Sequence, residues 1–173
     1  MTGRILIAGI GNIFHRDDAF GVEVVSQLRS VPENVRVVDF GIRGFDLMLA
    51  LLEGYDLVVF VDTVQRGGLP GTLYKIEPDV NAIPEATEIG GFSNAHSLDP
   101  LSVLSMAKSL GAVAKRILVI GCEPEILEDD TGAIGLSVAV QASVAPAIDM
   151  IRAVIDEFCR LGAGSLRPER VIQ

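Results

Sequence analysis

The sequence predicts one α/β domain of three layers, in which helices cover both faces of a twisted, mostly parallel sheet of about five strands. Apolar runs of strand length alternate along the chain with longer segments of helical periodicity. Several runs are apolar at consecutive positions, which is typical of strands that are buried on both faces. With 173 residues, the chain is long enough to bury a core without disulfides or a structural metal. We therefore expect a single domain over residues 1–173, with a frayed tail after about 162.

The expected strands are short apolar runs that end at turn residues. The first, RILIAG, stops at a glycine, and the third, LVVFVD, stops at an aspartate. Because such runs are too short for typical helices, we assign them to the sheet. They cover residues 4–9, 35–40, 57–62, 72–77 and 116–121.

The expected helices carry apolar residues three to five positions apart. They cover about 18–29, 44–53, 100–110 and 137–161. Asp99 and Pro100 are a start signal for the third helix, and Gly111 is a stop signal for it. Pro146 lies inside the last segment, where it is expected either to kink the helix or to break it.

Two loops, 63–71 and 78–95, are rich in turn residues and have no helical or strand periodicity. Loops of that length in a small domain usually bind something or move. We expect the second loop to contribute to the choice of substrate.

Composition excludes several classes of function. The formal net charge of −9 repels nucleic-acid phosphates, and no Lys/Arg-rich patch offsets it, so we expect no nucleic-acid partner. No apolar run approaches the ~18 residues that cross a bilayer, and the N-terminus lacks a secretory signal pattern. Cys122 and Cys159 form no C-x-x-C arrangement, so neither a disulfide framework nor a cysteine zinc site is supported. We expect a cytoplasmic monomer that does not bind membranes.

The segment GIGNIFHRDDAFG, residues 9–21, begins like a phosphate-binding loop of the dinucleotide type. That motif needs a third glycine at position 14, where this chain has Phe14. Two adjacent carboxylates, Asp17 and Asp18, would repel phosphate. Asp39 resembles the ribose-binding acid that such folds place after their second strand, and a dinucleotide-binding module therefore stays an alternative.

Polar residues that follow different strands favour a metal site instead. Asp18 follows the first strand, Asp62 ends the third, and His96 follows the long loop at 78–95. In an open α/β sheet these positions gather at the carboxyl ends of the strands, where ligands bind. Two carboxylates and an imidazole suit nickel or zinc and leave coordination positions open. From spacing alone, a helix cap at Asp18 and a turn at Asp62 are about as probable as ligand roles.

The remaining polar residues of the first loop have other expected roles. We expect Asp17 to cap the following helix or to orient a neighbour, and His15 to lie at the surface or contact substrate. Cys122 is expected to be a core or rim thiol, since no histidine is placed to activate it. The chain has no H-E-x-x-H, G-x-S-x-G or G-x-x-x-x-G-K-[ST] motif.

Taken in order, several segments resemble the hydrogenase maturation proteases, which process the large subunit of nickel-iron hydrogenases. The resemblance covers about residues 4–160. The segments that carry it are GIGNIFHRDDAFG (9–21), VDFGIRG (38–44), FVDTVQRGGLPGT (60–72), AHSLDPLSVL (95–104), IGCEPE (120–125) and GLS (135–137). Where many relatives have Thr after the glycine of the second-strand loop, this chain has Ile42, which bears on substrate choice.

The resemblance implies a metal-dependent or aspartic-type endopeptidase that removes the C-terminal extension of a nickel-loaded large-subunit precursor. Asp18, Asp62 and His96 would be both the metal ligands and the catalytic residues. The nickel would come with the precursor, and zinc or cadmium could occupy the same site. Either the metal polarises the carbonyl or a water, or a carboxylate such as Asp17, Asp18 or Asp39 acts as general base. A metal-sensing chaperone that does not cleave is a further alternative.

Overall fold

The computed structural model describes residues 3–84, 100–111, 114–128 and 132–161. His96, Asp99 and the tail after about 162 lie outside the described residues, as does most of the loop at 78–95. In chain order the elements are β1 (Ile5–Ile10), η1 (Arg16–Ala19), α1 (Phe20–Gln27), β2 (Val35–Gly41), α2 (Gly44–Leu52), β3 (Leu57–Thr63), β4 (Leu73–Ile76), η2 (Val80–Ala82), α3 (Pro100–Ser109), β5 (Arg116–Cys122) and α4 (Val138–Leu161).

The strands form one five-stranded sheet in the order β2-β1-β3-β5-β4. The pairs β1·β2, β1·β3 and β3·β5 are parallel, and β4 alone runs antiparallel to β5. The predicted mostly parallel α/β sheet is therefore confirmed. The chain passes from β1 to β2 on one side and then crosses to β3 on the other, so the strand order reverses between β1 and β3. Such a reversal is where open α/β sheets bind ligands.

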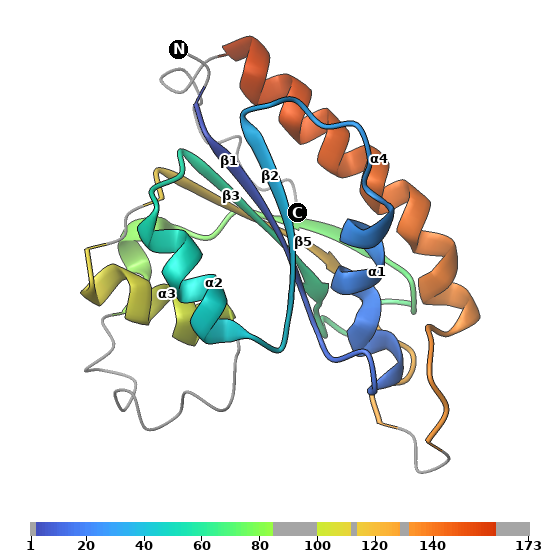
Figure 1. Ribbon diagram of the computed structural model, residues 1–173. Helices are drawn as coiled ribbons and strands as arrows, with labels where there is room; N and C mark the ends of the chain where they lie inside the picture. The colour runs from blue at the N-terminus through green and yellow to red at the C-terminus, as the bar shows by residue number, and fades with distance from the viewer. Residues whose placement is uncertain (1–2, 85–99, 112–113, 129–131, 162–173) are drawn as a thin grey trace.

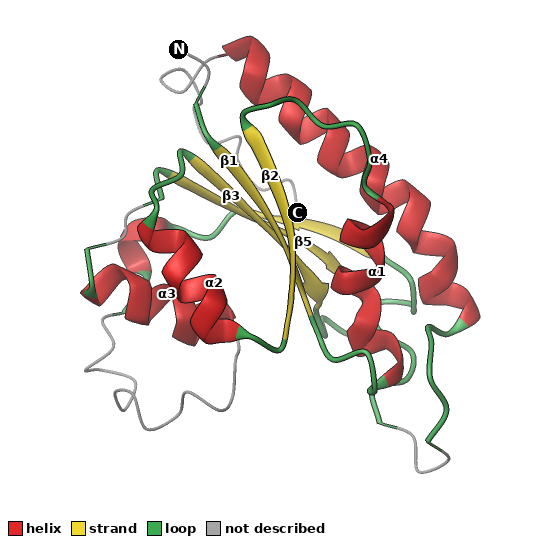
Figure 2. Ribbon diagram, viewed as in Figure 1, coloured by secondary structure: helices red, strands yellow, loops and turns green. Residues whose placement is uncertain are grey.

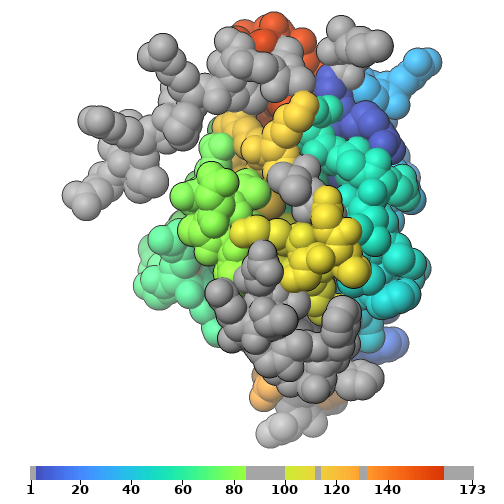
Figure 3. All heavy atoms as spheres, turned by 90° about the vertical axis from the view of Figure 1, so that its left-hand side faces the viewer, coloured from blue at the N-terminus to red at the C-terminus, as the bar shows by residue number. Residues whose placement is uncertain are grey.

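Helices cover both faces of the sheet, as predicted (Figures 1 and 2). One core lies between the sheet, α1 and α4, and contains Phe20 and Ile151. The other lies beneath α2 and α3, which Figure 3 shows side by side on the surface of that face, and contains Leu47 and Phe60. Every residue of β1 is buried, which explains why its sequence is apolar at consecutive positions.

The long C-terminal helix α4 continues through Pro146 instead of ending there. Among the described helices, α4 is the one that is long and apolar enough to cross a membrane, judged by length and composition alone. In this fold its apolar face, which includes Val144, Ile151 and Phe158, packs against α1 and the sheet. The apolar face is thus used as part of the core.

Candidate active site

Two acidic residues meet at the point where the strand order reverses. Asp18 lies in η1, after β1, and Asp62 lies near the end of β3. Gly9 of β1 pairs with Val61 of β3, so the two strands leave the sheet at the same edge. We call Asp18 and Asp62 the acid pair. Their convergence agrees with the prediction that ligand-binding residues gather at the carboxyl ends of the strands.

Thr63 joins the two members of the acid pair. Its backbone amide donates to Oδ1 of Asp62 at 2.7 Å, and its hydroxyl lies 3.4 Å from Oδ1 of Asp18. Oδ2 of Asp18 accepts from the backbone amide of Asn12 at 2.8 Å. Both carboxylates are therefore held by the protein, and Oδ2 of Asp62 has no such contact among the described residues.

The environment of Asp62 disfavours its charge. Burial, together with the nearby charge of Asp18, raises the pKa of Asp62 from 3.8 to about 7, although the amide of Thr63 favours the ionised form. A divalent cation between the carboxylates would remove this repulsion. Oxygen donors of this kind, held with open positions, fit a divalent metal, although the described residues contain no group of three or more metal-binding side chains. The third predicted ligand, His96, lies outside the described residues.

The first loop differs from a phosphate-binding loop in its hydrogen bonds. The amide of Asn12, which such a loop would offer to phosphate, donates to Asp18 instead. A Cβ on Gly11 would lie 1.7 Å from the carbonyl oxygen of Asp18. A Cβ on Gly21 would lie 2.0 Å from the carbonyl oxygen of Val61, so Gly21 permits the close helix-to-strand contact that the third glycine permits in dinucleotide loops. A carboxylate thus occupies the place of the phosphate.

Asp17 does not cap the helix that follows it, contrary to one of its two predicted roles. Neither η1 nor α1 has a side-chain cap at its start. The side chain of Asp17 is fully buried, and its oxygens accept hydrogen bonds from the amides of Glu125, Ile126 and Ser137. Since its oxygens face these amides inside the protein, Asp17 cannot contact a peptide substrate. The prediction failed because all three donors lie more than a hundred positions away in the sequence.

His15 and Asp39 have exposed side chains at the same edge of the sheet. For His15, this agrees with the expected surface position. Asp39 lies near the end of β2, in register with Gly9 of β1, and its carbonyl oxygen accepts from the guanidinium of Arg43.

The sequence analysis missed Glu123, a buried acid directly after β5. Its carboxylate accepts from the amides of Arg66 and Gly67 and from the hydroxyl of Tyr74. These bonds, led by the one from Arg66, hold the pKa of Glu123 below its usual value. Glu123 thereby fixes the loop that follows the acid pair. The neighbouring Cys122 is buried, and burial raises its pKa to about 11, so the predicted core thiol is confirmed.

Exposed apolar side chains follow each strand that ends at the carboxyl edge of the sheet, in the next loop or in the first turn of the next helix. We call them the apolar rim. They follow β1, β2, β3 and β5 in turn, and comprise Ile13, Phe14, Ile42, Phe45, Leu69, Ile134 and Val138. Phe14 is 68% exposed and Phe45 is 63% exposed. Exposed apolar groups gathered around a polar site are typical of a surface that binds another protein.

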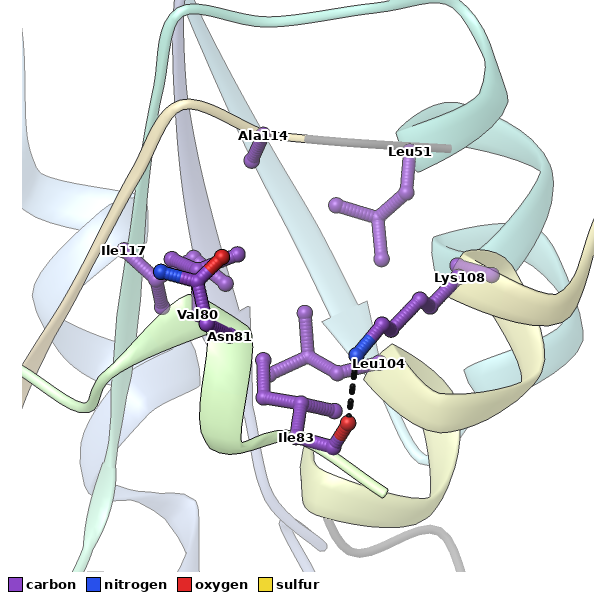
Figure 4. Close-up of a pocket in the computed structure, with 9 residues that line it drawn as sticks. Leu51, Val80, Asn81, Ile83, Leu104, Lys108, Ala114 and Ile117 are labelled. Carbon is purple, nitrogen blue, oxygen red and sulfur yellow. Dashed lines mark hydrogen bonds between the residues drawn. The ribbon is translucent and has the colours of Figure 1, made fainter. Parts of the chain in front are cut away.

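A small cavity of about 80 Å³ lies beneath α2 and α3 (Figure 4). Its lining includes Leu51 from the end of α2 and Ile117 from the start of β5, which places it toward the amino-terminal edge of the sheet. At this cavity Nζ of Lys108 donates to the carbonyl oxygen of Ile83 at 2.7 Å. The cavity is therefore separate from the acid pair.

Comparison with known proteins connects this geometry to a family. A family model described as hydrogenase maturation protease matches residues 22–154. The chain belongs to the hydrogenase maturation protease family. Within this family it is 37% identical over 158 residues to the hydrogenase expression/formation protein HupD of Bradyrhizobium diazoefficiens, covering 90% of this chain and 79% of HupD. It is 30% identical to the hydrogenase 2 maturation protease of Escherichia coli, covering 89% of this chain and 92% of that protein.

Solved structures of the family have the same fold. The hydrogenase maturating endopeptidase HybD from E. coli aligns with a TM-score of 0.72 and 29% identity, over 89% of this chain and 93% of HybD. The hydrogenase 2 maturation peptidase of a Thaumarchaeota archaeon aligns with a TM-score of 0.66 and 31% identity, over 88% of this chain and 97% of that protein. The resemblance recognised in the sequence is thus confirmed, and so is the α/β fold.

Proposed function

We propose that this protein is a metal-dependent endopeptidase that removes the C-terminal extension of a nickel-loaded hydrogenase large-subunit precursor. The observation that carries the proposal is the acid pair: Asp18, from the turn after β1, and Asp62, from β3, share the contact with Thr63 at the reversal point of the sheet. Membership of the hydrogenase maturation protease family supplies the protease activity and the class of substrate.

In this proposal, nickel is part of the substrate. Asp18, Asp62 and His96 bind the nickel that the precursor already carries, so that only a loaded precursor is held in the orientation for cleavage. The raised pKa of Asp62 supports this role, because a cation would stabilise the ionised pair that the free protein disfavours. Zinc or cadmium would occupy the same ligands in the absence of the precursor.

The chemical step is hydrolysis of one peptide bond. Bound nickel can act as a Lewis acid on the scissile carbonyl or on a water molecule. The protein contributes in two ways. Its metal ligands orient the precursor, and a carboxylate near the metal can accept a proton from the attacking water. Asp18 and Asp62 are available for this, whereas the buried Asp17 is not.

The apolar rim supports a protein substrate. The family acts on a protein, and the rim offers apolar contacts at the same edge of the sheet as the acid pair. A nucleotide would need amides and positive charge at the first loop, whereas this loop has a carboxylate bonded to Asn12. We also propose that the protein acts in the cytoplasm as a monomer that makes a transient complex with the precursor.

The test is intact-mass analysis of the large-subunit precursor after incubation with the protein. The expected result is one C-terminal loss that requires nickel in the precursor and disappears in Asp62→Asn and His96→Ala. Asp149→Asn, which neutralises an exposed carboxylate on α4, should cleave as the wild type does. Binding of the loaded precursor without any loss of mass would instead establish the chaperone alternative.

A further inference from the structure

The buried Asp17 performs a task that neither metal binding nor hydrolysis explains. Its side chain is 0% exposed. Oδ2 accepts from the amides of Glu125 and Ile126, each at 2.8 Å, and Oδ1 accepts from the amide of Ser137 at 2.6 Å. Burial of a carboxylate is costly unless both oxygens are hydrogen-bonded, and here three backbone donors meet that need.

These bonds join the first loop to the chain between β5 and α4. The amide of Asp17 also donates to the carbonyl oxygen of Ile126 at 3.0 Å, so the two residues are bonded in both directions. Ser137 directly precedes α4, and its hydroxyl accepts from the amide of Val140. A carboxylate at this helix start is favoured by the helix dipole. Asp17 therefore ties both ends of the β5–α4 connection to the turn that carries Asp18.

The turn itself is short and begins in a strained conformation. η1 has only four residues and no side-chain cap, and it begins at Arg16, whose φ is +48°. A non-glycine residue in that region costs about 1–2 kcal/mol. Such a turn does not persist unless contacts from outside impose it. The contacts of Asp17 with Glu125, Ile126 and Ser137 are contacts of this kind.

We propose that Asp17 is a positioning residue for the metal ligand Asp18. By fixing η1 against the β5–α4 connection, it sets the position from which Asp18 contacts Asn12 and Thr63 and faces Asp62. The assignment of Asp18 as a ligand rests on the function proposed above. The positioning of the Asp18 carboxylate by Asp17 does not depend on that assignment.

Amide hydrogen exchange tests the positioning directly, because the amide of Asn12 is bonded to the Asp18 carboxylate. In Asp17→Asn, exchange at Asn12 should accelerate roughly tenfold or more, as expected when a bond to a charged group is lost. The matched control is Asp56→Asn. Asp56 is also a carboxylate that joins distant segments, through the amide of Arg4 and Nζ of Lys115, but it lies at the opposite edge of the sheet. Asp56→Asn should leave exchange at Asn12 unchanged.

Metal binding gives a second readout on the same variants. Calorimetry with Ni²⁺ should show a dissociation constant raised roughly 10- to 100-fold in Asp17→Asn, as for other residues that orient a ligand, and unchanged in Asp56→Asn. In the cleavage assay, Asp17→Asn should lower kcat with little change in KM. If the wild type does not cleave the nickel-loaded precursor while Asn12 exchange still accelerates only in Asp17→Asn, the positioning stands and the proposed function is wrong.

Unchanged exchange at Asn12 in a folded Asp17→Asn variant would overturn the proposal, and so would an equal acceleration in Asp56→Asn. If Asp17→Asn does not fold, native-state amide hydrogen exchange of the wild-type protein tests the positioning role instead. Exchange should then show one shared opening event, with the same free energy of opening, for the amides of Asn12, Glu125, Ile126 and Ser137. Exchange at Asn12 that is roughly tenfold faster than at the other three would overturn the proposal.

Discussion

The hydroxyl of Thr63 lies 3.4 Å from Oδ1 of Asp18, a contact between residues 45 positions apart that joins the loops after β1 and β3. The amide of the same threonine holds Asp62. One residue thus orients both members of the acid pair. Its hydroxyl can be removed without removing the amide.

Replacing Thr63 by valine should weaken metal binding moderately. The hydroxyl contact with Asp18 is lost, but the amide contact with Asp62 remains, so the loss should be roughly 1 kcal/mol, or about fivefold in the dissociation constant. Calorimetry with Ni²⁺ or Zn²⁺ measures this. Thr63→Ser keeps the hydroxyl and should bind like the wild type, and equal weakening in both variants would mean that the hydroxyl is not responsible.

The acid pair should destabilise the metal-free protein at neutral pH. The folded pKa of Asp62, about 7, lies above its ordinary value of 3.8, so the folded state holds the proton more tightly. Stability is therefore lost as pH rises from about 4 to about 7, and the loss is complete above that range. In Asp62→Asn this loss is absent.

With a chelator present, Asp62→Asn should therefore gain stability over the wild type as pH rises. The gain between pH 5 and pH 8 should be roughly 2–3 kcal/mol, because over about two of these pH units the unfolded carboxyl is ionised and the folded one is not. Urea unfolding at both pH values checks it, with Asp149→Asn as the control for loss of a surface charge. A constant difference between Asp62→Asn and the wild type would show that Asp62 titrates normally.

The apolar rim should govern the affinity for the precursor and not the rate at which the bound precursor is cleaved. Phe14→Ser or Phe45→Ser should raise KM roughly tenfold and leave kcat nearly unchanged, because large exposed side chains of this kind contribute most to protein–protein contacts. Leu110 is 50% exposed and follows α3 at the other edge of the sheet. Leu110→Ser should have no effect on cleavage, so a raised KM in all three variants would argue against a local docking surface.

Glu123 should stabilise the loop after the acid pair. Glu123→Gln loses the charge that the amides of Arg66 and Gly67 and the hydroxyl of Tyr74 bind, so exchange at those amides should accelerate and the Tm should fall. Because the folded pKa of Glu123 is lowered, this contribution is present at neutral pH and is lost as pH falls through that pKa. Glu125→Gln, which changes an exposed side chain two residues away, should leave Tm unchanged.

The sequence allowed prediction of the elements because local pattern determines them. β1 and β3 are apolar at consecutive positions since both faces of each are covered, and the helix expected over 100–110 is found as α3. The meeting of Asp18 and Asp62 followed from the rule for parallel sheets. The bonds of Asp17 and Glu123 could not be predicted, because their partners lie far away in the sequence and no local pattern marks them.

The account's central claim is that the acid pair contacts nickel carried by the precursor. The most direct measurement is nickel K-edge X-ray absorption of a loaded precursor whose scissile bond is blocked, recorded alone and in saturated complex with the protein. The account predicts that the wild-type complex gains oxygen or nitrogen ligands at nickel and that the complex with Asp62→Asn gains fewer. An unchanged nickel spectrum in a saturated wild-type complex would contradict it.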